Sequence, residues 1–352
     1  MSAHAPADRE ALAALLRDRS ASGTPVGVVG GGSGSRRGWD VAAPHTTLST
    51  RGLDRIVSHE PADLTVTVEG GVPVATLQAA LAQRGQTWIQ AGHRPDATVG
   101  GVLATALSGH RRLRFGAVRD SLLQVVLATG DGRIVSAGGK TVKGVAGYDI
   151  PRLAVGSLGT LGVIVEVTLK LWPAPPSAAW FTATGDPTSL AALGARVLRD
   201  VHQPGAVLLE PGRLLVEIIG PADDLVAPAG MAPCDAPADP AFPATASVGV
   251  PPTAVADLAG RLARLGVRFR AQMGVGTCEV ELRDPSDVPA VREAALALGG
   301  HAVVTDAPPE FRADPWGPPP PGLAIMRRLR TAFDPAGVLN PGMFIHRPEA
   351  AT

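Results

Sequence analysis

Two glycine-rich stretches of this chain have the residue types of a loop that binds a flat or negatively charged ligand. The first follows the apolar run 26–29, and the second, residues 156–162, precedes a β-branched run. Glycines let a backbone approach a ligand without Cβ atoms in the way. Exposed N–H groups beside serine hydroxyls suit a pyrophosphate, and an ordinary glycine turn is the alternative for the first stretch. Its candidate binding residues are Gly30, Gly31, Gly32, Ser33, Gly34 and Ser35.

A third stretch, residues 91–109, is dominated by small residues, so a ligand or another backbone must pass close to it. Its hydroxyl groups offer hydrogen bonds without bulk. Tight helix packing is the alternative reading. The candidate binding residues are Gly92, Thr98, Val99, Gly101, Thr105, Ser108 and Gly109 here, and Gly159, Gly162, Val163 and Ile164 in the later stretch.

The first glycine stretch does not have the dinucleotide-binding form of a Rossmann fold. That form needs a third glycine and a following helix. Counting from Gly32, the third position holds Arg37, and the residues after it, GWDVAAPHTT, do not form a helix. No Walker lysine follows either.

The elements that must position these stretches are short strands in the first half and alternating strands and helices in the second. A Pro-rich piece at 173–176 is the expected domain boundary. Before it we expect helices over 7–18 and 74–84, strands over 26–29, 46–49, 54–58, 64–69, 122–129, 133–136 and 163–171, and a helical or turn segment over 98–107. After it we expect strands over 179–183, 206–209, 214–219, 267–273, 277–282 and 301–305, and helices over 187–201, 253–265 and 287–298. The second half therefore predicts an antiparallel sheet with helices on one side.

The motifs in this order resemble the vanillyl-alcohol-oxidase-type (PCMH) FAD flavoproteins. Besides the three stretches, they include VKGVAGYD over 142–149 and FDPAGVLNPG over 333–342. SGHRR over 108–112 and GAVRD over 116–120 resemble the smaller FAD-binding subunit of bacterial glycolate oxidase (glycolate dehydrogenase). The resemblance covers residues 25–175 and 322–345.

The resemblance implies an α+β protein with a PCMH-type FAD-binding domain and an antiparallel, ferredoxin-like cap. We expect the FAD domain over 1–175, the cap over 176–320, and a C-terminal segment, 321–352, that returns to the FAD domain. The FAD should be bound non-covalently, because Ser33 and Ser35 stand where attachment would need a His or Cys.

A base must take the hydroxyl proton of the substrate while hydride leaves for the flavin. The candidates are His93, His110, Lys143 and Tyr148, and we assign the catalytic role to Lys143 and Tyr148. The eight histidines show no metal-ligand spacing, so we expect no metal site. Catalytic hydroxy-acid flavoproteins of this fold carry a histidine-rich metal motif that this chain lacks.

The charge and hydropathy of the sequence limit which kinds of partner the protein can bind. The formal net charge is zero over 352 residues, which gives no electrostatic case for nucleic acid. No signal peptide or membrane span is seen, so we expect a cytoplasmic protein that reaches a membrane only through partner subunits. The resemblance implies a larger flavoprotein subunit and an iron–sulfur subunit, with the basic loop 111–114 and the proline loops 233–252 and 307–321 as candidate docking surfaces.

Two functions remain open. The first is an FAD-binding subunit of a complex that oxidises a small 2-hydroxy acid, glycolate to glyoxylate. The second is a stand-alone FAD-dependent dehydrogenase of a D-lactate-like acid.

Overall fold

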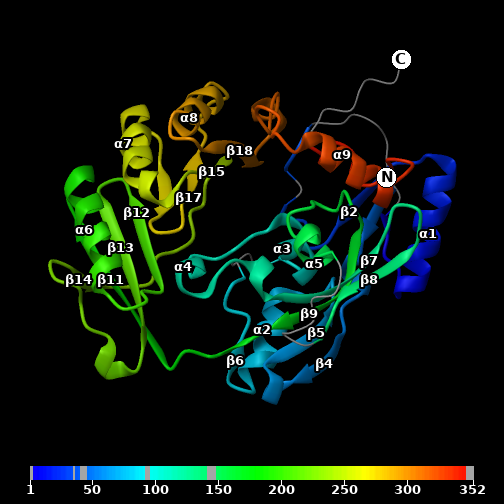
Figure 1. Cartoon of the computed structure of the whole chain (residues 1–352), viewed down its shortest axis with the longest axis horizontal. Coiled ribbons are helices and arrows are strands. Elements are labelled where there is room, and N and C mark those ends of the chain that lie inside the picture. Colours follow the sequence, from blue (N-terminus) through cyan, green and yellow to red (C-terminus); the bar gives the residue numbers. More distant parts are fainter. Residues whose placement is uncertain (1–2, 35, 40–45, 92–95, 141–147, 346–352) are drawn as a thin grey trace. The chain divides into compact units, whose positions relative to one another are not determined.

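The computed structural model describes residues 3–34, 36–39, 46–91, 96–140 and 148–345 (Figure 1). The chain divides into two units with separate sheets and cores. Unit 1 comprises residues 1–109, 117–174 and 318–352, and unit 2 comprises residues 110–116 and 175–317. The chain therefore crosses between the units four times, at 109/110, 116/117, 174/175 and 317/318.

The main sheet of unit 1 has five antiparallel strands in the order β4-β5-β9-β7-β8. Alternation along β5 sends Val66 and Val68 into one core and leaves Thr67 on the other face, where its hydroxyl lies 3.0 Å from that of Thr168. The strands are β4 (Ile56–Glu60), β5 (Thr65–Glu69), β7 (Leu122–Ala128), β8 (Ile134–Gly138) and β9 (Val163–Lys170).

Helices cover both faces of this sheet. Helices α2 (Val74–Ala82), α3 (Val99–Thr105) and α5 (Ile150–Ala154) contribute buried side chains to the core that contains Val66 and Val68. Helix α1 (Arg9–Ser22) places Leu12 and Leu16 in the core on the other face. Fully buried Trp88 donates its indole N–H to the Ser121 hydroxyl over 2.8 Å, so the largest side chain of this core has no unsatisfied polar atom.

Two small sheets and the C-terminal helix complete unit 1 (Figure 1). Strands β1 (Ala3–His4), β3 (Thr46–Ser49) and β2 (Val26–Val29) pair in parallel in that order, and β6 (Gln86–Thr87) pairs with β10 (Trp172–Pro173). The C-terminal helix is α9 (Leu323–Phe333).

The sheet of unit 2 has eight antiparallel strands in the order β14-β11-β13-β12-β16-β17-β15-β18. Two β-α-β-β modules, β11-α6-β12-β13 and β15-α7-β16-β17, meet edge to edge where β12 pairs with β16. The strands are β11 (Ser177–Thr184), β12 (Ala206–Glu210), β13 (Arg213–Gly220), β14 (Ala232–Cys234), β15 (Thr245–Gly249), β16 (Phe269–Gln272), β17 (Thr277–Glu281) and β18 (His301–Asp306). The helices are α4 (Arg112–Phe115), α6 (Pro187–Asp200), α7 (Val255–Leu265) and α8 (Asp287–Leu296).

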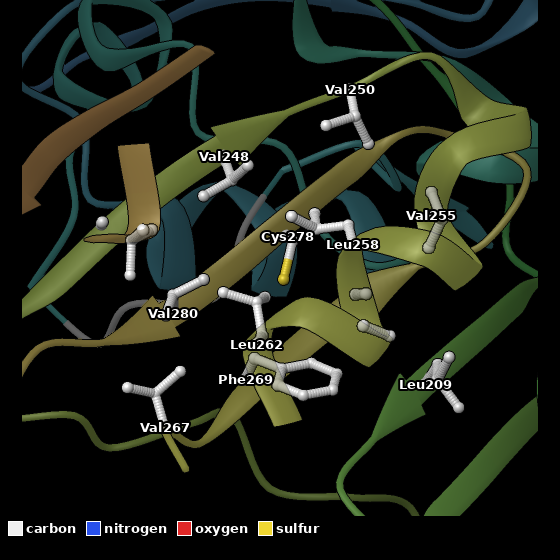
Figure 2. Close-up of a cluster of buried hydrophobic side chains, with 14 of the residues drawn as sticks. Leu209, Val248, Val250, Val255, Leu258, Leu262, Val267, Phe269, Cys278 and Val280 are labelled. Atoms are coloured by element: carbon white, nitrogen blue, oxygen red, sulfur yellow. The ribbon is translucent and has the colours of Figure 1, made fainter. Parts of the chain in front are cut away.

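The core of unit 2 lies between this sheet and its helices. Figure 2 shows Leu258 and Leu262 of α7 against Val248, Cys278 and Val280 of the sheet. Burial raises the pKa of the Cys278 thiol well above its ordinary value, so this cysteine is a packing residue. The arrangement confirms the predicted antiparallel sheet with helices on one side.

The prediction of a loop over residues 233–252 is wrong in part. Part of the stretch expected as an exposed proline loop over 233–252 is β15, an interior strand between β17 and β18. Ala246 and Val248 of this strand are buried, and burial inside a sheet overrides the local Pro and Ala composition. This strand is therefore not an accessible docking surface.

The basic segment 110–116 is built into unit 2. Arg111 makes a two-pronged ion pair with Glu217, whose carboxylate is fully buried, at 2.7–3.1 Å. Arg114 donates to the carbonyl of Ile219 over 2.6 Å. Burial alone would raise the pKa of Glu217, but hydrogen bonds from His110 and Arg111 and their charges outweigh it and hold that pKa below its ordinary value. Arg111 and Arg114 thus have intramolecular partners, contrary to the expected docking loop.

In the described part of the chain, no helix combines the length and apolar character that crossing a bilayer requires.

Replacing Arg111 with Met should lower the free energy of unfolding of unit 2 by about 3–5 kcal/mol at neutral pH, because it leaves a buried carboxylate without its guanidinium. The Glu217 contribution is complete above the unfolded carboxyl pKa of about 4.3 and is lost as pH falls through the lower folded value. Urea titrations at neutral and acid pH should therefore show the difference shrinking in acid. Arg119→Met, which removes an exposed pair at 3.7 Å with Asp120, is the control and should cost under about 1 kcal/mol. An equal cost for both variants would contradict the assignment.

Candidate functional site

The glycine loop that follows β2 packs directly against the turn before α3. A Cβ on Gly31 would fall on the carbonyl oxygen of Asp96, and a Cβ on Gly30 would collide with the Thr98 hydroxyl. A Cβ on Gly34 would lie 3.4 Å from the Thr105 methyl group. The two loops therefore approach at a distance that only glycine allows.

Helix α3 in turn holds the second glycine-rich stretch. The N–H of Gly156 donates to the Leu103 carbonyl over 3.0 Å, and the N–H of Leu158 donates to the Ala104 carbonyl over 2.9 Å. Leu158 has φ +53° and Gly159 has φ +69°, so the stretch turns sharply at this point. These bonds fix the stretch to the C-terminal half of α3.

A residue of the C-terminal segment connects the strand before the first glycine-rich stretch to the second stretch through hydrogen bonds. The side-chain amide of Asn340 accepts the N–H of Val28 and donates to the carbonyl of Leu158, both over 2.6 Å. A Cβ on Gly159 would collide with the amide nitrogen of Asn340. The Gly30–Gly34 loop, the segment Thr98–Thr105, residues 156–159 and Asn340 thus form one ring of contacts within unit 1, and we call this ring the glycine cradle.

A buried aspartate shapes the turn that leads into Asn340. The Asp334 carboxylate is 2% exposed and accepts the N–H groups of Val338 over 3.1 Å and Leu339 over 2.9 Å. Burial raises the pKa of Asp334 above its ordinary value, although these N–H groups and the charge of Arg330 act in the opposite direction.

The three predicted hydroxyl ligands differ in whether the hydroxyl proton is already donated within the protein. Thr98 accepts the N–H of Gly101 over 3.2 Å, and Ser108 accepts the N–H of Val118 over 3.2 Å. Accepting an N–H leaves the O–H of each residue unused by that bond, because a hydroxyl donates once and accepts through two lone pairs. Thr98 is 2% exposed, and its hydroxyl lies beside Gly30. Thr105 already donates its proton to the Gly101 carbonyl over 2.8 Å. Thr98 and Ser108 are therefore better suited to a phosphate than Thr105.

The tip of the first loop fits a pyrophosphate. Gly32 is exposed, has φ +87°, and its Cβ position has no protein atom within 4 Å. One residue with a positive φ next to residues with ordinary φ values can turn successive N–H groups toward one side, which makes an anion-binding concavity. Gly30 and Gly31 serve loop packing, whereas Gly32 leaves open space beside the backbone.

The remaining predicted residues are packed against other parts of unit 1 or lie outside the described residues. Val163 and Ile164 are buried in separate cores, so only their backbone atoms can face a ligand. Gly162 approaches Ala128, whose carbonyl oxygen would lie 2.9 Å from an added Cβ, and the N–H of Gly109 donates to the Gln90 carbonyl over 3.0 Å. Ser35, Gly92 and Lys143 lie outside the described residues.

The candidate bases receive little support from their surroundings. The Tyr148 side chain is 93% exposed, so no neighbouring group of the described chain encloses its phenol. His110 lies 3.6 Å from the Glu217 carboxylate and packs edge-on against Trp180. His93, like Lys143, lies outside the described residues.

Two features of the cradle were not assigned from the sequence. Asn340 belongs to the recognised closing motif, but no pattern indicated which groups its amide would join. Gly70 contacts both the strand β9 and α3: its added Cβ would fall on the Ile164 carbonyl, and its own carbonyl accepts the N–H of Gly100 over 2.8 Å. The adjacent pair Gly70-Gly71 after a strand was the available signal.

Comparison with known families agrees with this geometry. Residues 3–138 match the FAD binding domain model, and residues 318–344 match the model of the C-terminal domain of FAD linked oxidases. Both matched regions contribute to the glycine cradle.

Curated relatives match about half of the chain. Glycolate oxidase subunit GlcE of Escherichia coli is 38% identical over 168 residues, 47% of this chain and 47% of that protein. D-lactate dehydrogenase of Archaeoglobus fulgidus is 35% identical over 48% of this chain and 38% of its own length. Glycolate oxidase subunit GlcD of Bacillus subtilis is 34% identical over 49% of this chain and 37% of its own. The chain thus aligns with less than half the length of each.

The structural similarity to known proteins covers more of the chain than the sequence similarity does. A solved alkyldihydroxyacetonephosphate synthase superposes with a TM-score of 0.65 over 96% of this chain and 75% of that chain, at 15% identity. The predicted fold, a PCMH-type FAD-binding domain with an α+β cap, is confirmed. Residues 3–138 of this chain carry an FAD binding domain, and FAD is the cofactor of the chain.

Proposed function

We propose that this chain is the FAD-binding subunit of a glycolate-oxidase-type complex that oxidises a small 2-hydroxy acid, glycolate to glyoxylate. The observation that carries the proposal is the assembled glycine cradle, in a chain that is 38% identical to a glycolate oxidase subunit over 168 residues. FAD, when bound, supplies the acceptor for the hydride that leaves the hydroxyl-bearing carbon. The chain's own residues bind and orient it.

In this proposal the backbone around Gly32 and the hydroxyls of Thr98 and Ser108 bind the pyrophosphate. Ser108 is the residue before Gly109, where the chain leaves unit 1 for the segment 110–116. Binding is non-covalent, because the serines of the first loop cannot form the bond that a histidine or cysteine would.

The subunit role is favoured over independent catalysis by the surroundings of the candidate bases. Tyr148 is exposed and His110 is paired with Glu217. The assignment of the base to Lys143 and Tyr148 stays a prediction. We propose that a larger flavoprotein subunit supplies the catalytic groups and that an iron–sulfur subunit carries electrons onward. Two cysteines are too few to hold a cluster with four cysteine ligands in this chain.

The second candidate is a stand-alone FAD-dependent dehydrogenase of a D-lactate-like acid. The observation in its favour is the 35% identity to an archaeal D-lactate dehydrogenase over 169 residues. A cytoplasmic location, with membrane association only through partners, belongs to the first proposal.

Acid precipitation of the purified yellow protein should release FAD into the supernatant, at about one equivalent per chain. The physical reason is that unfolding destroys a site made of backbone groups and hydroxyls. Flavin that stays with the precipitated protein would disprove non-covalent binding.

Gly31→Ala should weaken FAD binding at least about tenfold, equivalent to about 1.4 kcal/mol, because its Cβ displaces the loop from the Asp96 carbonyl. The control is Gly85→Ala, at an exposed turn with φ +64° and open space around its Cβ. It should cost about 1 kcal/mol of stability through backbone strain and leave the FAD dissociation constant unchanged. Fluorescence titration of the apoproteins measures both constants, and equal affinities would remove Gly31 from the site.

The isolated chain, loaded with FAD, should show little dye-linked oxidation of glycolate or D-lactate, and co-expression with the two partner subunits should restore glycolate turnover. Flavin absorbance after anaerobic mixing with each acid separates flavin reduction from the later electron transfer. Rapid bleaching and turnover by the chain alone would instead support the stand-alone dehydrogenase.

A further inference from the structure

The C-terminal segment runs beside strand β2, directly before the first glycine loop. The N–H of Val26 donates to the Val338 carbonyl and the N–H of Asn340 donates to the Val26 carbonyl, each over 2.8 Å. Leu339 pairs with Val26 in a parallel bridge and is fully buried. These backbone bonds and this packing already dock the segment on β2.

The Asn340 side chain adds a function that docking does not require. Its oxygen accepts from Val28, two residues before Gly30, and its nitrogen donates to Leu158, one residue before Gly159. The orientation of the amide is settled by its partners, since a backbone N–H only donates and a carbonyl only accepts. Both bonds are short, at 2.6 Å, and both partner groups are backbone atoms, one in β2 just before the first loop and one in the stretch 156–159.

The surrounding geometry is arranged for this one side chain. Asn340 itself has φ +40°, a conformation that asparagine tolerates better than most residues. Gly159 has no Cβ where the Asn340 amide nitrogen sits. On the far side of the first loop, the N–H of Trp39 donates to the Gly342 carbonyl over 2.7 Å. The segment therefore holds the chain both before and after the Gly30–Gly34 loop.

We propose that Asn340 is a positioning residue for FAD, which sets the spacing between the Gly30–Gly34 loop and the stretch 156–162. This inference rests on the proposed assignment of those loops to FAD. A ligand held by backbone N–H groups from two separate loops depends on their separation, because a shift of either loop lengthens its hydrogen bonds. The Asn340 side chain bonds both to Val28, near the end of the strand that leads into the first loop, and to Leu158 of the second stretch.

Asn340→Asp provides the test. Its carboxylate still accepts the Val28 N–H but repels the Leu158 carbonyl, so the apoprotein should bind FAD at least about tenfold more weakly near pH 8. A protonated carboxyl group can donate to that carbonyl, and the adjacent Leu158 carbonyl disfavours the ionised form and raises the pKa of the introduced carboxyl group. Affinity should therefore recover toward the wild-type value as the pH is lowered from about 8 through about 5. FAD dissociation constants come from fluorescence titration, and apoprotein melting temperatures are measured in parallel.

Leu339→Ala is the matched control, because it loosens the packing of the same segment without removing the amide. It should lower the melting temperature while changing the FAD dissociation constant less than Asn340→Asp does, and with no recovery in acid. If both variants lose FAD affinity in proportion to their loss of stability, Asn340 acts only through folding and the inference fails. If wild-type and Asn340→Asp proteins bind FAD equally, the inference fails while the cofactor assignment stands. If the folded wild-type protein does not bind FAD, the proposed function fails as well.

Discussion

The close approach of backbone to backbone at Gly31 and Asp96 is the constraint on which the cradle depends. No side chain fits at that contact, so the first loop rests on the turn before α3. Helix α3 then fixes residues 156–158 through hydrogen bonds from Gly156 and Leu158. A contact between two backbones cannot relax by a change of side-chain rotamer, so the spacing of the two loops is fixed. A cofactor bound by such loops meets N–H groups whose positions are set before it arrives, which reduces the ordering cost of binding.

The cradle is also a product of long-range chain order. Strand β2, helix α3, the stretch 156–162 and Asn340 come from four separate parts of the sequence. Asn340 and Val28 are 312 residues apart along the chain, and Asn340 and Leu158 are 182 apart. Unit 2 is inserted between them in sequence. The glycine cradle of unit 1 is thus complete only when the residues around Asn340 have packed against Val28 and Leu158.

Unit 2 contains a buried carboxylate, Glu217, that is compensated by an arginine from a distant part of the sequence. Glu217 sits on a strand with no exposure, and Arg111 reaches it from the seven-residue segment 110–116, which the chain contributes from between two parts of unit 1. A buried carboxylate is tolerated only when such a partner compensates its lost hydration. The segment 110–116, which looks like an exposed basic loop in the sequence, is therefore bonded into unit 2. Arg111 pairs with Glu217, and Arg114 donates to the Ile219 carbonyl.

The sequence by itself indicated most strands and helices through local periodicity, and it indicated the fold class and the cofactor through the resemblance of its ordered motifs to a known family. Alternation in Thr65–Glu69 and the glycine turn after β7 predict the sheet without reference to distant residues. Tertiary structure alone decided that β15 is an interior strand, that Arg111 pairs with Glu217, and that Asn340 joins two loops. Each of these depends on a partner far away in the chain, and burial next to that partner outweighs the local signal. The tertiary structure also separated the glycines: Gly31 is needed because another backbone lies against it, whereas Gly32 faces open space.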